Sequence, residues 1–76
     1  SRLQFAPEVK LSMPEPPAER DLESMLAWAL ERERRSVAIY GSSAAAASGA
    51  VRDMLRGLAR FEEEHVARLE SLRRYY

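Results

Sequence analysis

Two stretches of the chain repeat apolar residues with the alternating three- and four-residue steps of an α-helix. The first stretch comprises Leu26, Leu30, Glu33, Val37, Tyr40, Ala44 and Ala47. The second comprises Val51, Leu55, Leu58, Glu62, His65, Leu69, Leu72 and Tyr76. Steps of this kind keep residues on one face of a helix and form a heptad seam. The pattern therefore predicts two long helices, each with one mainly apolar seam.

The two helices are expected at about residues 18–46 and 50–74. Ala, Leu, Glu and Arg, all strong helix formers, dominate the chain from residue 18 onward, and no proline follows Pro17. The break between the helices is expected at Ser48-Gly49, because glycine readily adopts the left-handed conformation that ends a helix. No stretch shows the alternation typical of a strand. We therefore predict an all-α fold, an antiparallel two-helix hairpin over residues 18–76.

Residues 1–17 differ in character from the rest of the chain. They contain all four prolines, Pro7, Pro14, Pro16 and Pro17. Proline has no amide donor and biases the preceding residue away from the α-helical region. The segment is therefore predicted to be an extended arm or linker, either lying along a groove through its apolar side chains or forming a disordered tail.

Composition narrows the classes of function. The 76 residues include 12 Lys and Arg against 12 Asp and Glu, a net charge of zero, and no Cys. Disulfides, zinc–thiolate sites, iron–sulfur clusters and thiol nucleophiles are excluded. The balanced charge argues against a nucleic-acid partner, and no apolar run approaches the ~20 residues that span a membrane. We expect a cytoplasmic protein whose small core needs a metal or a partner chain to be stable.

Three polar residues interrupt the apolar seams near their middles. These are Glu33 in the first helix and Glu62 and His65 in the second. A carboxylate facing a helix-bundle core is costly unless it is paired, protonated or bound to a cation, and neither seam contains Lys or Arg. In an antiparallel hairpin, Glu33 lies about 15 residues before the turn and Glu62 about 13 after it, a mismatch of about 3 Å. A metal ion is the simplest cation to bind there.

Each of these residues also has an ordinary interpretation. Glu62 begins a run of three glutamates, and such runs usually form solvated faces. Glu33 lies within the charged segment 31–35, which is typical of a surface with intrahelical ion pairs. A single seam histidine is often a hydrogen-bonded core residue. The alternative hypothesis is therefore a metal-free helical hairpin, a structural or adaptor module that binds a partner helix through its apolar stripe.

Two copies of the hairpin would complete a known kind of metal site. Sites for two iron or two manganese ions in bundle cores use one Glu from each of two helices and a Glu-x-x-His pair from each of the other two. One hairpin supplies half of this set, so we predict that it dimerises into a four-helix bundle. Met25, Trp28 and Ile39 lie off the seams and are expected to form a second apolar strip for higher assembly.

Two segments carry a resemblance to a known family. ALERERRSVAIY (29–40) resembles the first helix of a rubrerythrin-like or ferritin-like half-bundle, and LARFEEEHVARLESL (58–72) resembles the second. The resemblance covers about residues 26–72. With one Glu and one Glu-x-x-His per chain, the hairpin is most similar to the encapsulated ferritins. Those proteins complete a di-iron site across a dimer interface and oxidise iron inside a protein nanocompartment.

This resemblance implies a role for each candidate residue. Glu33 would be the bridging ligand, Glu62 the second carboxylate ligand and His65 the nitrogen ligand. Tyr40 would lie near the iron, where it either supports the ligands or takes part in redox chemistry. The implied activity is a ferroxidase that oxidises Fe(II) to Fe(III) with dioxygen or peroxide, for iron storage or detoxification, with an encapsulating shell protein as a further partner. Manganese, with peroxide disproportionation, is the alternative metal. Departures from the family are the arginines at 32 and 34, where encapsulated ferritins carry acidic residues, and the absence of a targeting tail.

Overall fold

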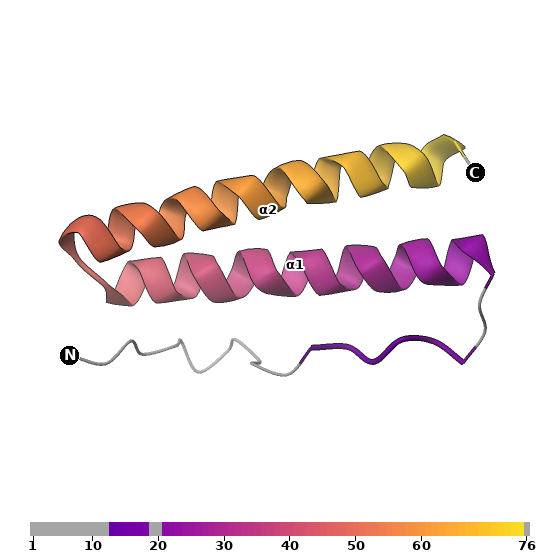
Figure 1. Ribbon diagram of the computed structural model, residues 1–76, viewed down its shortest axis with the longest axis horizontal. Coiled ribbons are helices and arrows are strands. Elements are labelled where there is room, and N and C mark those ends of the chain that lie inside the picture. Colours follow the sequence, from indigo (N-terminus) through magenta and orange to yellow (C-terminus); the bar gives the residue numbers. More distant parts are fainter. Residues whose placement is uncertain (1–12, 19–20, 76) are drawn as a thin grey trace.

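The computed structural model describes residues 13–18 and 21–75, which fold as two antiparallel helices (Figure 1). Helix α1 spans Leu22–Ala46 and α2 spans Gly49–Tyr75, and no strand occurs in these ranges. The predicted all-α hairpin is therefore confirmed. Neither helix contains a stretch long and apolar enough to cross a bilayer. Expectations for residues 1–12, 19–20 and 76, including the seam position Tyr76, concern residues outside the described ranges.

Helix α1 begins four residues later than expected from the sequence. Ala18 lies in a bend, and Asp21 caps the helix with an extended backbone and a side chain that accepts a hydrogen bond of 2.8 Å from the amide of Ser24. The physical reason is that an aspartate oxygen satisfies one of the free amides of the first turn, which alanine cannot do. Glu23 adds a negative charge at the positive end of the helix dipole.

The connection between the helices consists of Ala47 and Ser48, and its backbone groups form hydrogen bonds with residues close by in the sequence. Ala47 is extended, with φ −103° and ψ 175°, and its carbonyl accepts a 3.0 Å hydrogen bond from Nε of Arg52. Gly49 has φ +62°, the left-handed region that glycine enters at little cost. The chain thus reverses over two residues, and this fixes the heights at which side chains of α1 and α2 meet.

The predicted seam of α2 does not pack against α1 as a single line. Leu55 is buried, whereas Val51 and Leu72 are 45% and 46% exposed, and Ala59, outside the predicted seam, is buried. The predicted seam straddles two heptad stripes. The stripe that contains the buried residues is Leu55, Ala59, Glu62, Val66 and Leu69. The other, called the open stripe below, is Val51, Met54, Leu58, Phe61, His65, Arg68, Leu72 and Tyr75.

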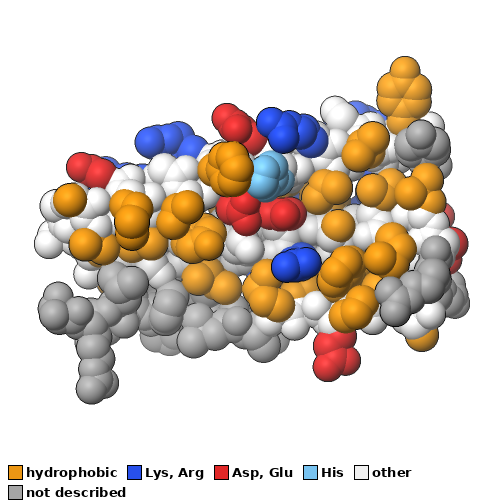
Figure 2. Space-filling view, viewed as in Figure 1, with side chains coloured by type: hydrophobic (Ala, Val, Ile, Leu, Met, Phe, Trp, Pro, Cys, Tyr) orange, Lys and Arg blue, Asp and Glu red, His pale blue; other side chains and the backbone are white. Residues whose placement is uncertain are grey.

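The apolar arc of α2 is split in this way because it is wider than one neighbouring helix can cover. α1 packs against half of the arc, and the other half remains on the surface. Figure 2 shows hydrophobic side chains on this face to either side of the histidine and the acidic side chains beside it. The metal-site candidates therefore lie in the middle of an exposed apolar face.

Residues 13–18 run beside α1 on the side away from α2 (Figure 1). Nε1 of Trp28 donates a 3.0 Å hydrogen bond to the carbonyl of Pro14. The guanidinium of Arg32 lies 5.6 Å from the centre of the Trp28 ring. Trp28, expected in a strip for higher assembly, is thus half-buried against its own chain.

Candidate metal centre

The hairpin brings together three of the four residues singled out from the sequence. Glu33 comes from α1, and Glu62 and His65 come from one face of α2. Each offers one ligand atom, and the three atoms all lie within 4.8 Å of one another. Residues from the middles of two antiparallel helices meet in this way because the two-residue turn sets them at nearly the same height.

The imidazole of His65 directs Nδ1 toward both carboxylates. Nδ1 lies 2.9 Å from Oε1 of Glu62 and 3.8 Å from Oε2 of Glu33. Two ligands that each bind a divalent ion at about 2.1 Å are about 3.0 Å apart at a right angle and 3.8 Å apart at about 130°. Both distances are therefore compatible with one ion shared by the three side chains.

One oxygen of the Glu33 carboxylate has no hydrogen-bond partner. This atom, Oε2, is buried, and the Glu33 side chain as a whole is 25% exposed. Two of the three arginines in the segment pair with other carboxylates: Arg34 with Glu70 at 2.8 Å and Arg35 with Glu31 at 3.3 Å. The expected intrahelical ion pairing is therefore found between Glu31 and Arg35, but it does not include Glu33.

The surroundings of Glu33 disfavour its charged form. Desolvation raises the pKa of this carboxyl, and a hydrogen bond with the side chain of Glu62 and the charge of that side chain raise it further, while the charges of His65 and Arg32 oppose the shift. Two carboxylates that face each other with little solvent repel each other unless one of them is protonated or a cation lies between them. The electrostatics thus agree with the geometry, because a bound cation would relieve both the desolvation and the repulsion.

A neighbour that the sequence analysis missed contacts the imidazole. The rings of Phe61 and His65 meet edge to face, with centroids 4.5 Å apart and an interplanar angle of 65°. The two residues are one turn apart on α2, the i,i+4 spacing at which helical side chains meet. Phe61 therefore restricts the orientation in which His65 presents Nδ1.

Tyr40 lies on the same helix as Glu33. It is half-buried on α1, two turns nearer the hairpin connection than Glu33, a separation of about 10 Å along the helix axis. Glu63 and Glu64 are exposed, as expected for the solvated part of the acidic run. The group of side chains that could hold a metal ion is therefore Glu33, Glu62 and His65.

Comparison of the chain with protein-family models, with curated proteins and with solved structures gave no match. The kind of metal ion that the site can hold therefore has to be inferred from its two carboxylate oxygens and one imidazole nitrogen. Carboxylate oxygens suit iron and manganese, and imidazole nitrogen suits iron. Three donors fill half of an octahedral shell, so positions remain for ligands from another chain or for an oxidant.

Proposed function

We propose that this protein is a ferritin-like ferroxidase that binds iron through Glu33, Glu62 and His65 and oxidises Fe(II) to Fe(III). The observation that carries the proposal is the buried, unpartnered Oε2 of Glu33, which faces a carboxylate and an imidazole nitrogen. Such an atom is costly in a metal-free protein and becomes favourable once it binds a cation. Iron storage or detoxification in the cytoplasm, inside a shell of another protein, would be the physiological setting.

A second copy of the chain would complete the site. Two copies related by a twofold axis supply four carboxylates and two imidazoles, the set used by two-metal sites in helix bundles. Four carboxylates carry a charge of −4, which two divalent ions neutralise. The family resemblance implies that Glu33 would bridge the two ions, and its Oε2 lies 3.8 Å from Nδ1 of His65, in reach of an ion that His65 would bind.

The reaction balances with iron as its substrate. Each of two Fe(II) ions gives up one electron, and dioxygen takes up two electrons and two protons and leaves as hydrogen peroxide. The carboxylates of Glu33 and Glu62 favour the product because anionic oxygen stabilises the higher charge of Fe(III). His65 must be neutral at Nδ1 to bind the ion, and Phe61 holds its ring in that orientation. Tyr40 remains a candidate for electron transfer at longer range.

Aerobic oxidation of Fe(II) by the pure protein tests the proposal. We expect the native chain to produce Fe(III) at least tenfold faster than buffer alone, and Glu62→Ala or His65→Ala to return the rate to that of buffer. Glu63→Ala is the matched control, since Glu63 lies beside Glu62 on the same helix and is exposed. Native rates in His65→Ala would contradict the proposal.

A metal-free adaptor is the second candidate, and the exposure of the open stripe favours it. An amphipathic helix with an uncovered apolar face can bind a partner helix without any metal. Metal analysis of the protein purified after growth with iron and manganese separates the candidates. Iron in amounts near one ion per chain supports the ferroxidase, manganese indicates peroxide disproportionation, and no metal indicates the adaptor.

A further inference from the structure

Arg32 is the arginine of the charged segment 31–35 that forms no ion pair with a carboxylate of the described residues. The other two arginines of this segment each pair with a glutamate, one on α1 and one on α2. The guanidinium of Arg32 lies instead 5.6 Å from the centre of the Trp28 ring, one turn earlier on α1. That distance is within the ~6 Å at which a guanidinium is attracted to the face of an aromatic ring. The partner of this cation is therefore an indole ring and not an acid.

The ring of Trp28 is itself held by a second contact. Its Nε1 donates a 3.0 Å hydrogen bond to the carbonyl of Pro14, and the residue is half-buried. An indole whose N–H is bound to the backbone in this way presents its face in one orientation. Residues 13–18 therefore fix the Trp28 ring, and the ring fixes the guanidinium of Arg32.

The carboxylate of Glu33 follows this cation directly in the chain. Its buried Oε2 accepts no hydrogen bond, although the exposed Arg32 is the adjacent residue. The charge of Arg32 already acts on Glu33, because it is one of the two that oppose the rise of the Glu33 pKa. An arginine stem is flexible, and its planar fork fits a carboxylate with two hydrogen bonds. Without the Trp28 ring, the guanidinium would therefore be free to turn toward Glu33.

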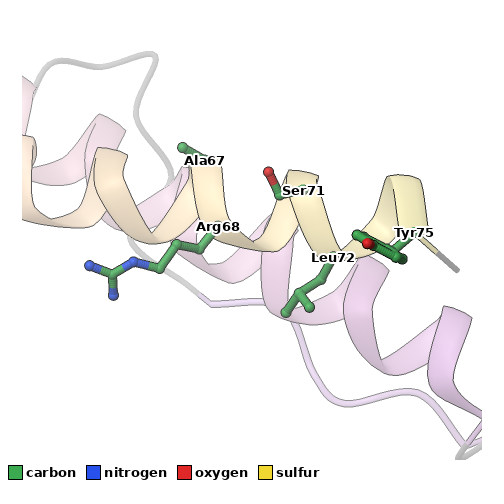
Figure 3. A pocket seen from close by; sticks show the side chains of 5 residues that line it. All are labelled: Ala67, Arg68, Ser71, Leu72 and Tyr75. Carbon is green, nitrogen blue, oxygen red and sulfur yellow. The ribbon is translucent and has the colours of Figure 1, made fainter.

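Arg68 is also exposed and lies one turn after His65, but its surroundings differ from those of Arg32. It lines a hollow on α2 together with Leu72 and Tyr75, and Figure 3 shows its side chain extending away from these two residues. Its charge is not among those that shift the pKa of Glu33. Arg68 is therefore a matched control for Arg32.

We infer that Trp28 is a positioning residue of the metal centre, which holds the guanidinium of Arg32 on its ring and so leaves the carboxylate of Glu33 open to a metal ion. The inference rests on the proposed function in that Glu33 binds the ion, and adds two residues that set the affinity. A guanidinium paired with Glu33 would have to be displaced before an ion could bind, because both use the same oxygen atoms. Residues 13–18 thereby influence metal affinity through the hydrogen bond to Trp28.

The dissociation constant for Mn(II) tests this inference in Trp28→Leu, in Arg32→Gln and in the double variant. Electron paramagnetic resonance of the free ion measures it, with every variant at the same protein concentration. We expect Trp28→Leu to bind Mn(II) about two- to fivefold more weakly than the native chain, the range that a cation–π contact at an exposed site supplies. Arg32→Gln should bind at least as tightly as the native chain. The double variant should match Arg32→Gln, because no cation is left for the ring to hold.

Trp28→Phe and Arg68→Gln are the controls. Phenylalanine keeps an aromatic face for Arg32 but has no N–H for the carbonyl of Pro14, so the dissociation constant of Trp28→Phe should lie between those of the native chain and Trp28→Leu. Arg68→Gln removes an exposed arginine that does not act on Glu33, so adding it to Trp28→Leu should not restore native binding. Circular dichroism checks that each variant folds.

Two patterns of Mn(II) affinity would overturn the inference. Equal weakening by Trp28→Leu with and without Arg32 would show that Trp28 acts through the fold in general, and native affinity in Trp28→Leu would show that the ring holds no competing cation. A native chain that binds no Mn(II) would overturn the inference together with the metal site. The expected affinities in a protein that fails to oxidise Fe(II) would contradict the ferroxidase alone. Oxidation of Fe(II) by a protein whose Mn(II) affinity does not depend on Trp28 would contradict this inference alone.

Discussion

Glu31 and Glu33 lie two residues apart in one charged segment, yet their carboxylates have opposite surroundings. Glu31 is on the outer side of α1 and pairs with Arg35 one turn later. Glu33 turns toward α2, where it meets Glu62 and His65 and gains no hydrogen bond at Oε2. The difference follows from helical periodicity, because residues two apart point to nearly opposite faces. One carboxylate is therefore an ordinary surface charge, and the other is a candidate ligand.

The raised pKa of Glu33 predicts how the metal-free protein responds to pH. The folded state binds a proton at Glu33 more tightly than the unfolded state, whose pKa is near 4.5. Stability from this group is therefore present at low pH and is lost as pH rises through the folded-state pKa. With EDTA present, Glu33→Gln should have a higher Tm than the native chain at pH 7, and the difference should shrink as pH falls toward 5.

Glu31→Gln is the control for this experiment. It removes a carboxylate of the same segment that already has a cationic partner, so its Tm at pH 7 should equal or fall slightly below that of the native chain. Thermal denaturation followed by circular dichroism measures both variants. Equal Tm values for Glu33→Gln and the native chain across this range would show that Glu33 is not strained in the metal-free state.

Glu33, Glu62 and His65 could be identified from the sequence because of helix geometry. Each is a polar residue at an apolar heptad position, and helix geometry alone sets all three at one height. The contact of Phe61 with His65 could not be found in the same way, because several positions lie one turn from any helical residue and the rotamers decide which of them touch. The heptad also places Tyr40 on the same side of α1 as Glu33, but two turns away, so the pattern alone does not bring it to the cluster.

Periodicity predicts the two helices, but it does not predict which part of the apolar face of α2 is covered by α1. The seam predicted for α2 combined residues that contact α1, such as Leu55, with residues that remain exposed, such as Val51. A heptad pattern defines the arc of a helix that is apolar, whereas the neighbouring helix determines which part of the arc is covered. The predicted start of α1, at about residue 18, is four residues too early. The helix preference of alanine favours a start at Ala18, whereas the cap at Asp21 sets the actual start.

Glycines at two positions of the hairpin should respond to substitution with opposite signs. Gly41 lies inside α1 with nothing within 4 Å of an added Cβ, so Gly41→Ala should stabilise the fold by about 0.5–1 kcal/mol. Gly49 has φ +62°, where an alanine is strained, so Gly49→Ala should destabilise it by about 1–2 kcal/mol. Urea denaturation of both variants, at one protein concentration, measures the changes. Stabilisation by Gly49→Ala would show that the turn does not need the left-handed conformation.

A single hairpin buries few apolar side chains. Its buried apolar residues within the described ranges are Leu30, Ala44, Leu55 and Ala59, and two of these are alanines. A core of this size gives a marginal fold on its own. The net charge of zero removes any overall repulsion between copies, and the open stripe presents six exposed apolar side chains. A second copy would therefore supply the part of the core that one chain lacks.

If the metal ligands come from two copies, metal binding and association must strengthen each other. Mn(II), which is stable in air and prefers the same oxygen-rich ligands, serves as the probe. At a free concentration 100 times its dissociation constant, each bound ion contributes about 2.7 kcal/mol, so two ions per dimer should tighten association by about 10⁴-fold. Sedimentation equilibrium with Mn(II) and with EDTA measures this shift. His65→Ala should lose most of it while keeping its apolar stripe, and Glu63→Ala should keep it. Mn(II) binding that leaves association unchanged would show that one chain holds the ion alone, because a ligand that binds one chain and the dimer equally well cannot shift the equilibrium between them.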